Sequence, residues 1–324
     1  MEQEQKTVQE NDQEQHQEIW SWGAGTDGQL ATGKLQDEHS PKLLRSLSAV
    51  GPPITLLSCG GAHAIAVISG GRVLTWGRGS SGQLGHGEMV NSLQPKFVKA
   101  FEGFVVTYVA AGWNHSGFIS DSGAIFTCGD GSFGQLGHGD YKSQCSPQEV
   151  SYFGSKQVEQ VACGMRHSLV LLRGNVENQV YGFGSGKRGQ LGISTDKVKS
   201  TSLPQITMGL TNLKIVNISA NGDHSAALSG EGKLFMLGGN RHGALGDSQK
   251  TSSMNNVSEN GSIMTWGWGE HGQLGLGDTN DQTAPRVVSL GRKFNEERAA
   301  TSRVYCGSGF SFVLRTYDVG SVMR

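Results

Sequence analysis

The stretch GRGSSGQLG at residues 77–85 decides the fold, because it recurs along the chain at a regular interval. Other copies read GDGSFGQLG, GSGKRGQLG and GWGEHGQLG, and two weaker ones read GAGTDGQLA and GGNRHGALG. The six copies start at Gly23, Gly77, Gly129, Gly184, Gly238 and Gly267, which gives four steps of 52 to 55 residues and a last step of 29. Such a pattern is typical of a repeat protein whose unit spans about 50 residues.

Two further marks keep the same register. A proline follows the first glycine of a copy by 18 residues at Pro41, Pro95, Pro147 and Pro285, and by 20 at Pro204. An apolar-Gly-x-x-His pattern, or one close to it, places His63, His115, His167 and His224 at steps of 52, 52 and 57 residues. Three independent marks in one register exclude a chance similarity between segments.

Each histidine is followed by an apolar run, a short glycine turn and a second apolar run, as in AIAVI-SGG-RVLTWG at residues 64–77. This alternation is typical of β-hairpins. A unit of 52 to 57 residues has room for about four strands and their turns, the size of one propeller blade. The sequence therefore predicts an all-β propeller, in which each repeated histidine bonds a backbone group within its own blade. Since one histidine per blade cannot converge on one ion, we expect no metal site.

Composition supports this interpretation. The chain has 49 glycines and 7 prolines in 324 residues, so glycine is about twice as frequent as the ordinary ~7%. Collagen would need far more proline, and helical bundles do not tolerate glycine at this density. The GxGxxG pattern is also found in dinucleotide sites, but there the glycines open a helix. Here Gln-Leu-Gly follows at once, so we interpret the motif as structural and expect no cofactor.

Charge, cysteines and hydropathy exclude other classes. The 27 basic and 28 acidic side chains give a formal net charge of -1, which does not favour a nucleic-acid-binding face. Five cysteines form no CxxC pair, as expected for reduced thiols and small core residues in an intracellular protein. No apolar stretch approaches the ~18 residues of a membrane span. We therefore expect a cytoplasmic or nuclear location and no membrane association.

These motifs resemble the regulator of chromosome condensation family, whose members are seven-bladed propellers. The resemblance rests on WGxGxxGQLG, the downstream proline and the CGxxHS segment, and it covers residues 19–314. The family includes the Ran guanine-nucleotide exchange factor, secretion-regulating relatives, the plant ultraviolet-B receptor and modules of larger ligases. The chromosome-bound member uses a basic N-terminal arm, whereas residues 1–18 hold six acidic groups and one lysine. Chromatin binding by that route is therefore not expected.

The chain departs from the family pattern in its fifth repeat and at its ends. Residues 248–258 carry neither the proline nor the histidine mark, and they offer no apolar run for a strand. We count five complete blades and one remnant strand at 262–266, as in a shortened, alternatively spliced product. The segment VYCGSGFSFVL carries Phe310 where histidine is expected. The run at 19–22 is predicted to complete the last blade, leaving an acidic, disordered tail at 1–18, the propeller at 19–314 and a C-terminal tail at 315–324.

No residue pattern points to a covalent catalyst. The resemblance implies a protein-interaction propeller, including an exchange factor or regulator for a small Ras-like GTPase. Alternatives are an ultraviolet-B photoreceptor, disfavoured because only residues 112–116 match the receptor's Trp-containing segment, and a passive scaffold. Turn residues that vary between repeats are the candidate partner contacts. They are Arg78, Trp113, Asp130, Arg166, Lys187, Arg188, Arg241 and His242.

Overall fold

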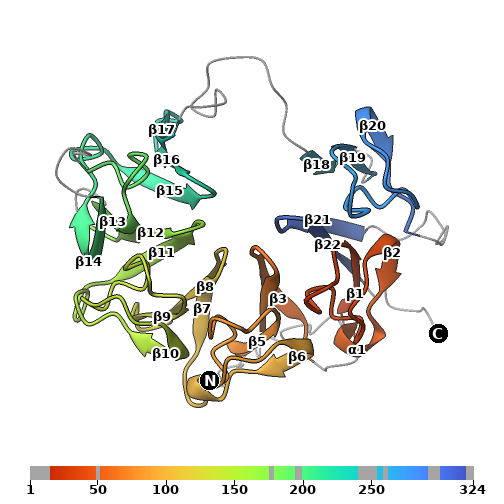
Figure 1. Cartoon of the computed structure of the whole chain (residues 1–324), viewed down its shortest axis with the longest axis horizontal. Helices are drawn as coiled ribbons and strands as arrows, with labels where there is room; N and C mark the ends of the chain where they lie inside the picture. The colour runs from red at the N-terminus through yellow and green to blue at the C-terminus, as the bar shows by residue number, and fades with distance from the viewer. Residues whose placement is uncertain are drawn as a thin grey trace, which may run out of the picture.

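Six antiparallel sheets follow one another around a common centre (Figure 1). The computed structural model describes residues 15–48, 52–174, 179–193, 199–239, 254–257, 262–290 and 300–318. The predicted all-β propeller is confirmed. Helical structure in the described ranges is confined to α1 (Arg45–Ser48) and η1 (Lys99–Phe101).

Four sheets have four strands, and three of these are continuous in sequence. Blade 2 consists of β3 (Ile54–Cys59), β4 (His63–Ile68), β5 (Arg72–Gly77) and β6 (Ser92–Phe97). Blade 3 consists of β7 (Val106–Ala111), β8 (His115–Ser120), β9 (Ile125–Gly129) and β10 (Gln144–Glu149). Blade 4 consists of β11 (Val158–Cys163), β12 (His167–Leu172), β13 (Gln179–Ser185) and β14 (Ser200–Ile206).

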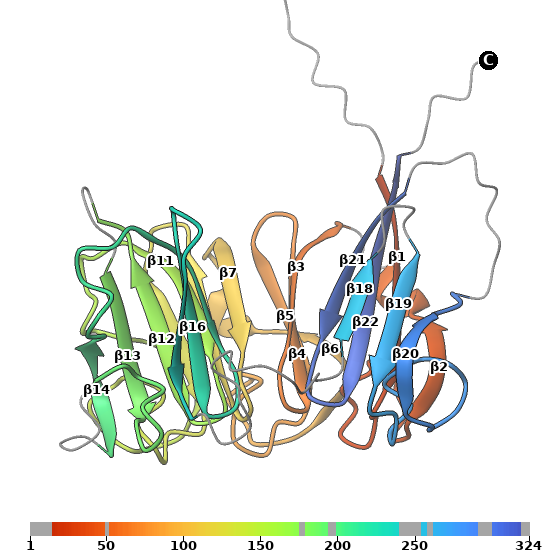
Figure 2. The ribbon, with the colours of Figure 1, turned by 90° about the horizontal axis from the view of Figure 1, so that it is seen from above.

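Blade 1 joins the two ends of the chain. It contains β1 (Gln15–Gly23) and β2 (Glu38–Leu43) from the N-terminal part, and β21 (Ala300–Cys306) and β22 (Phe310–Asp318) from the C-terminal part. Strands β1 and β22 lie side by side (Figure 2) and pair from Gln15↔Asp318 to Gly23↔Phe310. The expected completion of the last blade by residues 19–22 is confirmed.

The expected boundaries of the two tails were wrong by four residues each. Residues 15–18, assigned to the acidic tail, belong to β1, and residues 315–318 belong to β22. The two polar segments pair with each other through backbone hydrogen bonds, which do not require apolar side chains. Residues 1–14 and 319–324 lie outside the described residues.

The last two sheets show three strands each in the described residues. Blade 5 consists of β15 (Ile215–Ala220), β16 (His224–Ser229) and β17 (Leu234–Gly238). The remnant sheet consists of β18 (Met254–Val257), β19 (Ile263–Gly267) and β20 (Gln282–Val287). The expected remnant was a single strand, and this was wrong. β18 comes from residues 248–258, which were expected to form no strand. It pairs with β19 from Met254↔Trp266 to Val257↔Ile263. This pairing is possible because the backbone groups of an open strand edge accept any extended segment as a partner.

The position of each strand explains its composition. The second strands of blades 2, 3 and 4 are buried along their whole length, as expected for strands enclosed on both faces. Strands β2, β6, β10, β14 and β20 each contain one of the five repeated prolines. Each of them pairs on one side only, where proline is tolerated because no ladder bond is lost.

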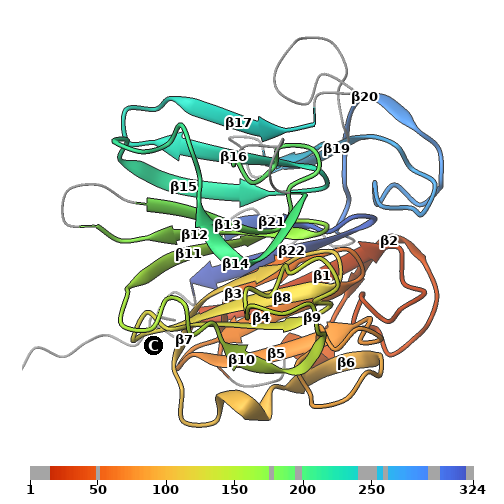
Figure 3. The ribbon, with the colours of Figure 1, turned by 60° about the vertical axis from the view of Figure 1, so that its left-hand side comes forward.

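Apolar clusters join successive sheets, which stack face to face as Figure 3 shows for blades 4 and 5. At the junction of blades 1 and 2, Trp76 meets Phe312 edge-on with ring centroids 5.8 Å apart. At the junction of blades 3 and 4, Phe153 meets Tyr181 at 5.6 Å. Further clusters join blade 2 to 3, blade 4 to 5 and the remnant sheet to blade 1. Among the described residues, no such cluster joins blade 5 to the remnant sheet.

Candidate functional site

In blades 1 to 4 and in the remnant sheet, the repeated glycine-rich segment forms a tight loop before the strand that carries the proline. In blade 2, Gly77 and Gly82 have φ values of +99° and +85°, a region that favours glycine. A side chain at Gly79 would place its Cβ 1.9 Å from the Val90 carbonyl oxygen. The Gln83 side chain then accepts a hydrogen bond from the Ser81 backbone N–H at 2.9 Å. No helix follows this loop, which agrees with the structural interpretation of the motif.

Three of the four repeated histidines, His63, His115 and His167, connect neighbouring blades. The His63 ring nitrogen Nε2 lies 2.9 Å from Ser116 Oγ of blade 3, and that hydroxyl donates to the Gln83 carbonyl of blade 2 at 2.7 Å. The expected bond to a backbone group within the same blade was therefore wrong. The rings of His63, His115 and His167 reach across a blade junction to the serine that follows the next histidine.

We call this series of contacts, from a histidine ring to a serine hydroxyl to a glutamine carbonyl, a histidine relay. It recurs at the next two junctions. His115 Nε2 lies 2.9 Å from Ser168 Oγ, which donates to the Gln135 carbonyl. At the next junction, His167 Nε2 lies 2.8 Å from Ser225 Oγ, which donates to the Gln190 carbonyl. Burial lowers the pKa of His63 and His167 to about 3 and that of His115 to about 4. The three rings are therefore neutral near pH 7 and act as structural links.

The GxxH glycines make room for these rings. A Cβ on Gly112 would lie 2.7 Å from Cε1 of His115, and one on Gly164 would lie 2.3 Å from Cε1 of His167. Gly307 has the same relation to the Phe310 ring, at 2.3 Å. Phe310 thus occupies the histidine position of blade 1, filling the space without a hydrogen bond from the ring.

Backbone bonds bring the glycine-rich loops and the GxxH turns to one end of the molecule. The Arg78 N–H donates to the Ala62 carbonyl, and the Asp130 N–H donates to the Asn114 carbonyl, both at 2.8 Å. We call this surface the loop face. It comprises residues 24–30, 60–62, 78–84, 112–114, 130–136, 164–166, 185–191, 221–223, 268–274 and 307–309. Six of the eight predicted contact residues lie on it, whereas Arg241 and His242 lie outside the described residues.

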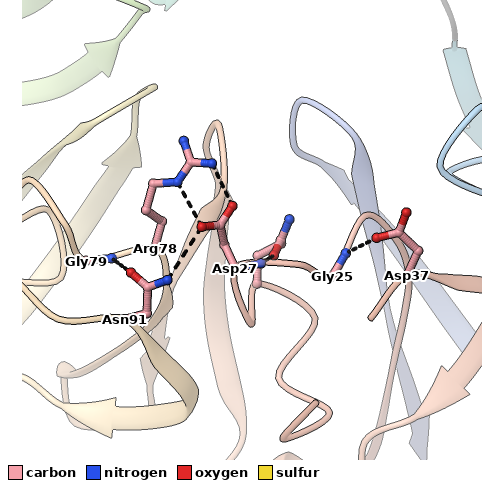
Figure 4. Close-up of polar contacts among 7 residues, drawn as sticks. Gly25, Asp27, Asp37, Arg78, Gly79 and Asn91 are labelled. Carbon is pink, nitrogen blue, oxygen red and sulfur yellow. Dashed lines mark hydrogen bonds and ion pairs between the residues drawn. The ribbon is translucent and has the colours of Figure 1, made fainter. Parts of the chain in front are cut away.

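Two of the six predicted residues make side-chain hydrogen bonds within the protein. The Arg78 guanidinium of blade 2 donates from Nε and Nη2 to the Asp27 carboxylate of blade 1, at 3.0 and 2.6 Å (Figure 4). The hydrogen bond to Asp27 raises the pKa of Arg78. The Asp130 carboxylate accepts bonds from the Ser132 N–H and Gln135 Nε2 within its own loop.

The other four present exposed surface on blades 3 and 4. Trp113 is 38% exposed. The Arg166 guanidinium lies 4.7 Å from the centre of the Phe133 ring, and Arg188 Nε lies 3.9 Å from an Asp223 carboxylate oxygen of blade 5. Lys187 is exposed beside Arg188. These residues form a cationic and aromatic surface across two successive blades.

Sequence reasoning missed the acidic partners of the loop face. Asp37 accepts from the Gly25 N–H (Figure 4) and also lies 3.2 Å from Nδ1 of His271 in the remnant sheet. A polar residue twelve positions after the second glycine recurs in this role at Asn91, Ser143 and Asp281. That fixed spacing is a signal in the sequence from which these hydrogen-bond acceptors can be found.

A cavity of about 460 Å³ opens at the centre of the propeller, lined by the ends of the inner strands. Backbone bonds connect its rim from blade to blade, such as Gly61 N–H to the Gly112 carbonyl and Trp113 N–H to the Gly164 carbonyl. The residues that occupy the position of Trp113 in the other blades are Gly61, Met165, Gly222 and Ser308. Trp113 is thus the one aromatic side chain among these five positions. Within the described residues, no three His, Cys, Asp or Glu side chains are placed to hold a metal ion.

Comparison with known families gives two matches that together cover most of the chain. Residues 18–257 match the RCC1-like domain, and residues 260–314 match the regulator of chromosome condensation (RCC1) repeat. None of the helices in the described part has the length and apolar character of a membrane span.

Several characterised proteins are similar in sequence. The chain is 32% identical to the ultraviolet-B receptor UVR8 of Arabidopsis thaliana over 294 residues, which cover 84% of this chain and 65% of the receptor. It is 31% identical to human HERC2, an E3 ubiquitin-protein ligase, over 94% of this chain and 6% of the ligase. A mouse secretion-regulating guanine nucleotide exchange factor is 31% identical over 79% of this chain and 61% of that protein. The chain thus spans less than two thirds of each of these relatives.

Solved structures support the fold. Prp20p from Saccharomyces cerevisiae, described with its binding properties to Gsp1p and histones, superposes with a TM-score of 0.60 at 21% identity, covering 94% of this chain and 92% of Prp20p. Human WBSCR16 superposes with a TM-score of 0.58 at 18% identity, covering 92% and 98%. The repeated loops, the blade order and both family matches agree, and this chain belongs to the RCC1-like family of β-propellers.

Proposed function

We propose that this chain is a protein-interaction propeller whose loop face binds a small Ras-like GTPase and regulates release of its guanine nucleotide. The observation that carries the proposal is the exposed surface of Trp113, Arg166, Lys187 and Arg188 on blades 3 and 4. Arginine and tryptophan are the residue types that most often dominate protein interfaces. The similarity to secretion-regulating exchange factors supports the choice of partner.

Nucleotide exchange demands no covalent chemistry from the propeller. A surface that binds the nucleotide-free GTPase more tightly than the loaded form shifts the equilibrium toward release. The blade junctions supply the rigid support that such differential binding needs, since buried relays and apolar clusters hold the loops in place. We expect the activity to be weaker than that of a seven-bladed relative, because a longer ring offers more loop surface.

The geometry around Trp113 disfavours the alternative of a photoreceptor, despite the similarity to the ultraviolet-B receptor. Coupled absorption and cation-held dimers need several indole rings beside guanidinium groups. Of the five equivalent positions that line the central cavity, only Trp113 is aromatic. The others hold Gly61, Met165, Gly222 and Ser308.

The test is a fluorescent-nucleotide release assay on a panel of Ras-like GTPases. We expect the chain to accelerate release from at least one member, and Lys187→Glu with Arg188→Glu to remove most of that effect. Lys214→Glu, an exposed charge reversal ahead of β15, is the matched control and leaves the rate unchanged. Absence of binding to every nucleotide-depleted GTPase would overturn the exchange proposal and favour a scaffold. Ultraviolet-induced dissociation of a dimer would instead favour the photoreceptor.

A further inference from the structure

A second concave surface lies at the end of blade 2 opposite the loop face. Strand β5 ends on the loop face at Gly77, which pairs with Ser92, while Leu74 pairs with Phe97 toward the other end. The chain then turns through η1 into β7. A cavity of about 520 Å³ lies here, within the size range of ligand sites. Its lining, which we call the η1 groove, consists of Arg72, Val73, Lys96, Phe97, Val98, Lys99, Phe101, Glu102, Gly103 and Phe104.

The floor of the η1 groove is apolar and built on the core. Val73, Val98 and Phe101 are buried in the cluster between blades 2 and 3. Phe104 is 44% exposed, although its ring packs edge-on against Phe126 at 5.4 Å and Phe101 at 6.3 Å. An exposed aromatic ring held by two others is an anchor surface that loses little side-chain entropy on binding.

The rim of the groove is mainly cationic. The Arg72 guanidinium lies 4.0 Å from the centre of the Phe97 ring, which is itself 36% exposed. Lys96 pairs with Glu88 at 2.8 Å, whereas no ion pair joins Arg72 or Lys99 to another described residue. Glu102 is the one acidic side chain of the lining. Two exposed cations beside apolar surface are therefore available to a ligand.

We propose that the η1 groove binds a short acidic peptide segment of a partner protein, with an apolar side chain against Phe97 and Phe104 and carboxylates at Arg72 and Lys99. The occupant follows from two properties of the site. The excess of basic over acidic rim residues complements an acidic chain. The mixed valine and phenylalanine floor suits an aliphatic or aromatic side chain, whereas a nucleic-acid strand would use stacked aromatic platforms along a longer basic track.

This proposal is independent of the proposed function. The η1 groove and the loop face lie at opposite ends of the blades, so a peptide and a loop-face partner do not compete for the same residues. Failure of GTPase binding leaves the groove proposal intact, and the converse also holds.

The experiment measures fluorescence anisotropy of labelled nine-residue peptides added to the full chain. The probe has a central Phe-Leu pair flanked by aspartates, and the matched peptide has lysines in place of the aspartates. We expect saturable binding of the acidic peptide, weaker binding as salt rises, and no binding of the basic peptide. Arg72→Glu with Lys99→Glu, and separately Phe104→Ala, should each weaken binding by about tenfold or more. Lys214→Glu and Met208→Ala change exposed residues elsewhere and should leave the affinity unchanged.

Circular dichroism and thermal unfolding of each variant establish that the propeller is intact. Equal binding of acidic and basic peptides, absence of binding up to millimolar peptide, or unchanged affinity in Phe104→Ala would each overturn the proposal. Tighter binding of a single-stranded oligonucleotide than of the acidic peptide would assign the groove to nucleic acid. Self-association that Phe104→Ala abolishes would assign it to a second copy of the chain.

Discussion

The junctions between blades 2, 3, 4 and 5 differ from the end of the series at blade 5. Each of these three junctions combines an apolar cluster with a buried histidine relay. His224, the next histidine in the pattern, is only half-buried, and its ring makes no hydrogen bond to another described residue. Leu228 and Leu234 of blade 5 are 37% and 64% exposed, as expected where no sheet of the described residues packs against them.

This difference shows the structural role of the repeated histidine. A histidine becomes a structural link only when the next blade supplies the serine and buries both groups. The same residue type at His224 stands in the same position of its own hairpin and lacks these contacts. The repeat therefore encodes a junction between blades, and an isolated blade does not satisfy it.

Acidification should lower the free energy of unfolding more than any single substitution, because it acts on all three histidine relays together. The lowered pKa values of His63, His115 and His167 mean that the unfolded chain binds these protons first as the pH falls below about 6.5. Stability is therefore present above that pH and is lost as the pH falls. We expect each histidine to contribute a loss of about 2 kcal/mol by pH 5. Urea unfolding at pH 7, 6 and 5 measures this loss. A free energy of unfolding that does not change with pH would contradict the role assigned to the relays.

Removing one relay histidine should have the next largest effect. His115→Ala deletes a fully buried ring and its bond to Ser168, which should lower the free energy of unfolding by about 3 kcal/mol. The matched variant His224→Ala should change it by less than about 1 kcal/mol. Urea unfolding followed by tryptophan fluorescence compares the two. Similar losses in both variants would mean that the end of the series is as tightly joined as the inner blades.

The glycine three positions before a relay histidine allows a finer comparison with an unpacked glycine in blade 5. Gly112→Ala would place a Cβ 2.7 Å from the Gly164 carbonyl oxygen and from the His115 ring, and we expect a loss of about 2 kcal/mol. Blade 5 carries Asn221 at this position, and at the next residue, Gly222, a Cβ would meet no atom within 4 Å. Gly222→Ala should therefore be neutral within about 0.5 kcal/mol. The melting temperatures of the two variants decide the point, and a larger loss at Gly222 would refute it.

The smallest effect is expected for the ion pair between blades 1 and 2. Arg78→Ala removes the bidentate contact with Asp27, but both side chains are partly exposed, at 34% and 20%. Solvent screening limits the loss to about 0.5–1 kcal/mol. Lys233→Ala, which breaks the exposed pair with Glu231 inside blade 5, is the control and should have no measurable effect. If thermal unfolding shows equal changes, the cross-blade pair has no special role.

The candidate site could be predicted from the sequence only in part. Variation inside the two repeated motifs pointed to eight residues, of which six lie on the loop face and two, Arg241 and His242, lie outside the described residues. The sequence did not show that Arg78 is held by Asp27, since the two residues lie 51 positions apart and meet only because blades 1 and 2 stack. Which of these residues contact a partner stays a prediction.

The sequence by itself determined the blade, because hairpin turns, strand-edge prolines and positive-φ glycines are local requirements that leave marks at fixed spacing. It also showed that residues 19–22 complete the last blade. Only the tertiary structure decided that the histidines bond across junctions, that Met254–Val257 covers β19 and that an apolar groove opens beside η1. These features depend on the distance between sheets that are remote in sequence, and that distance is set by how the sheets pack around the centre.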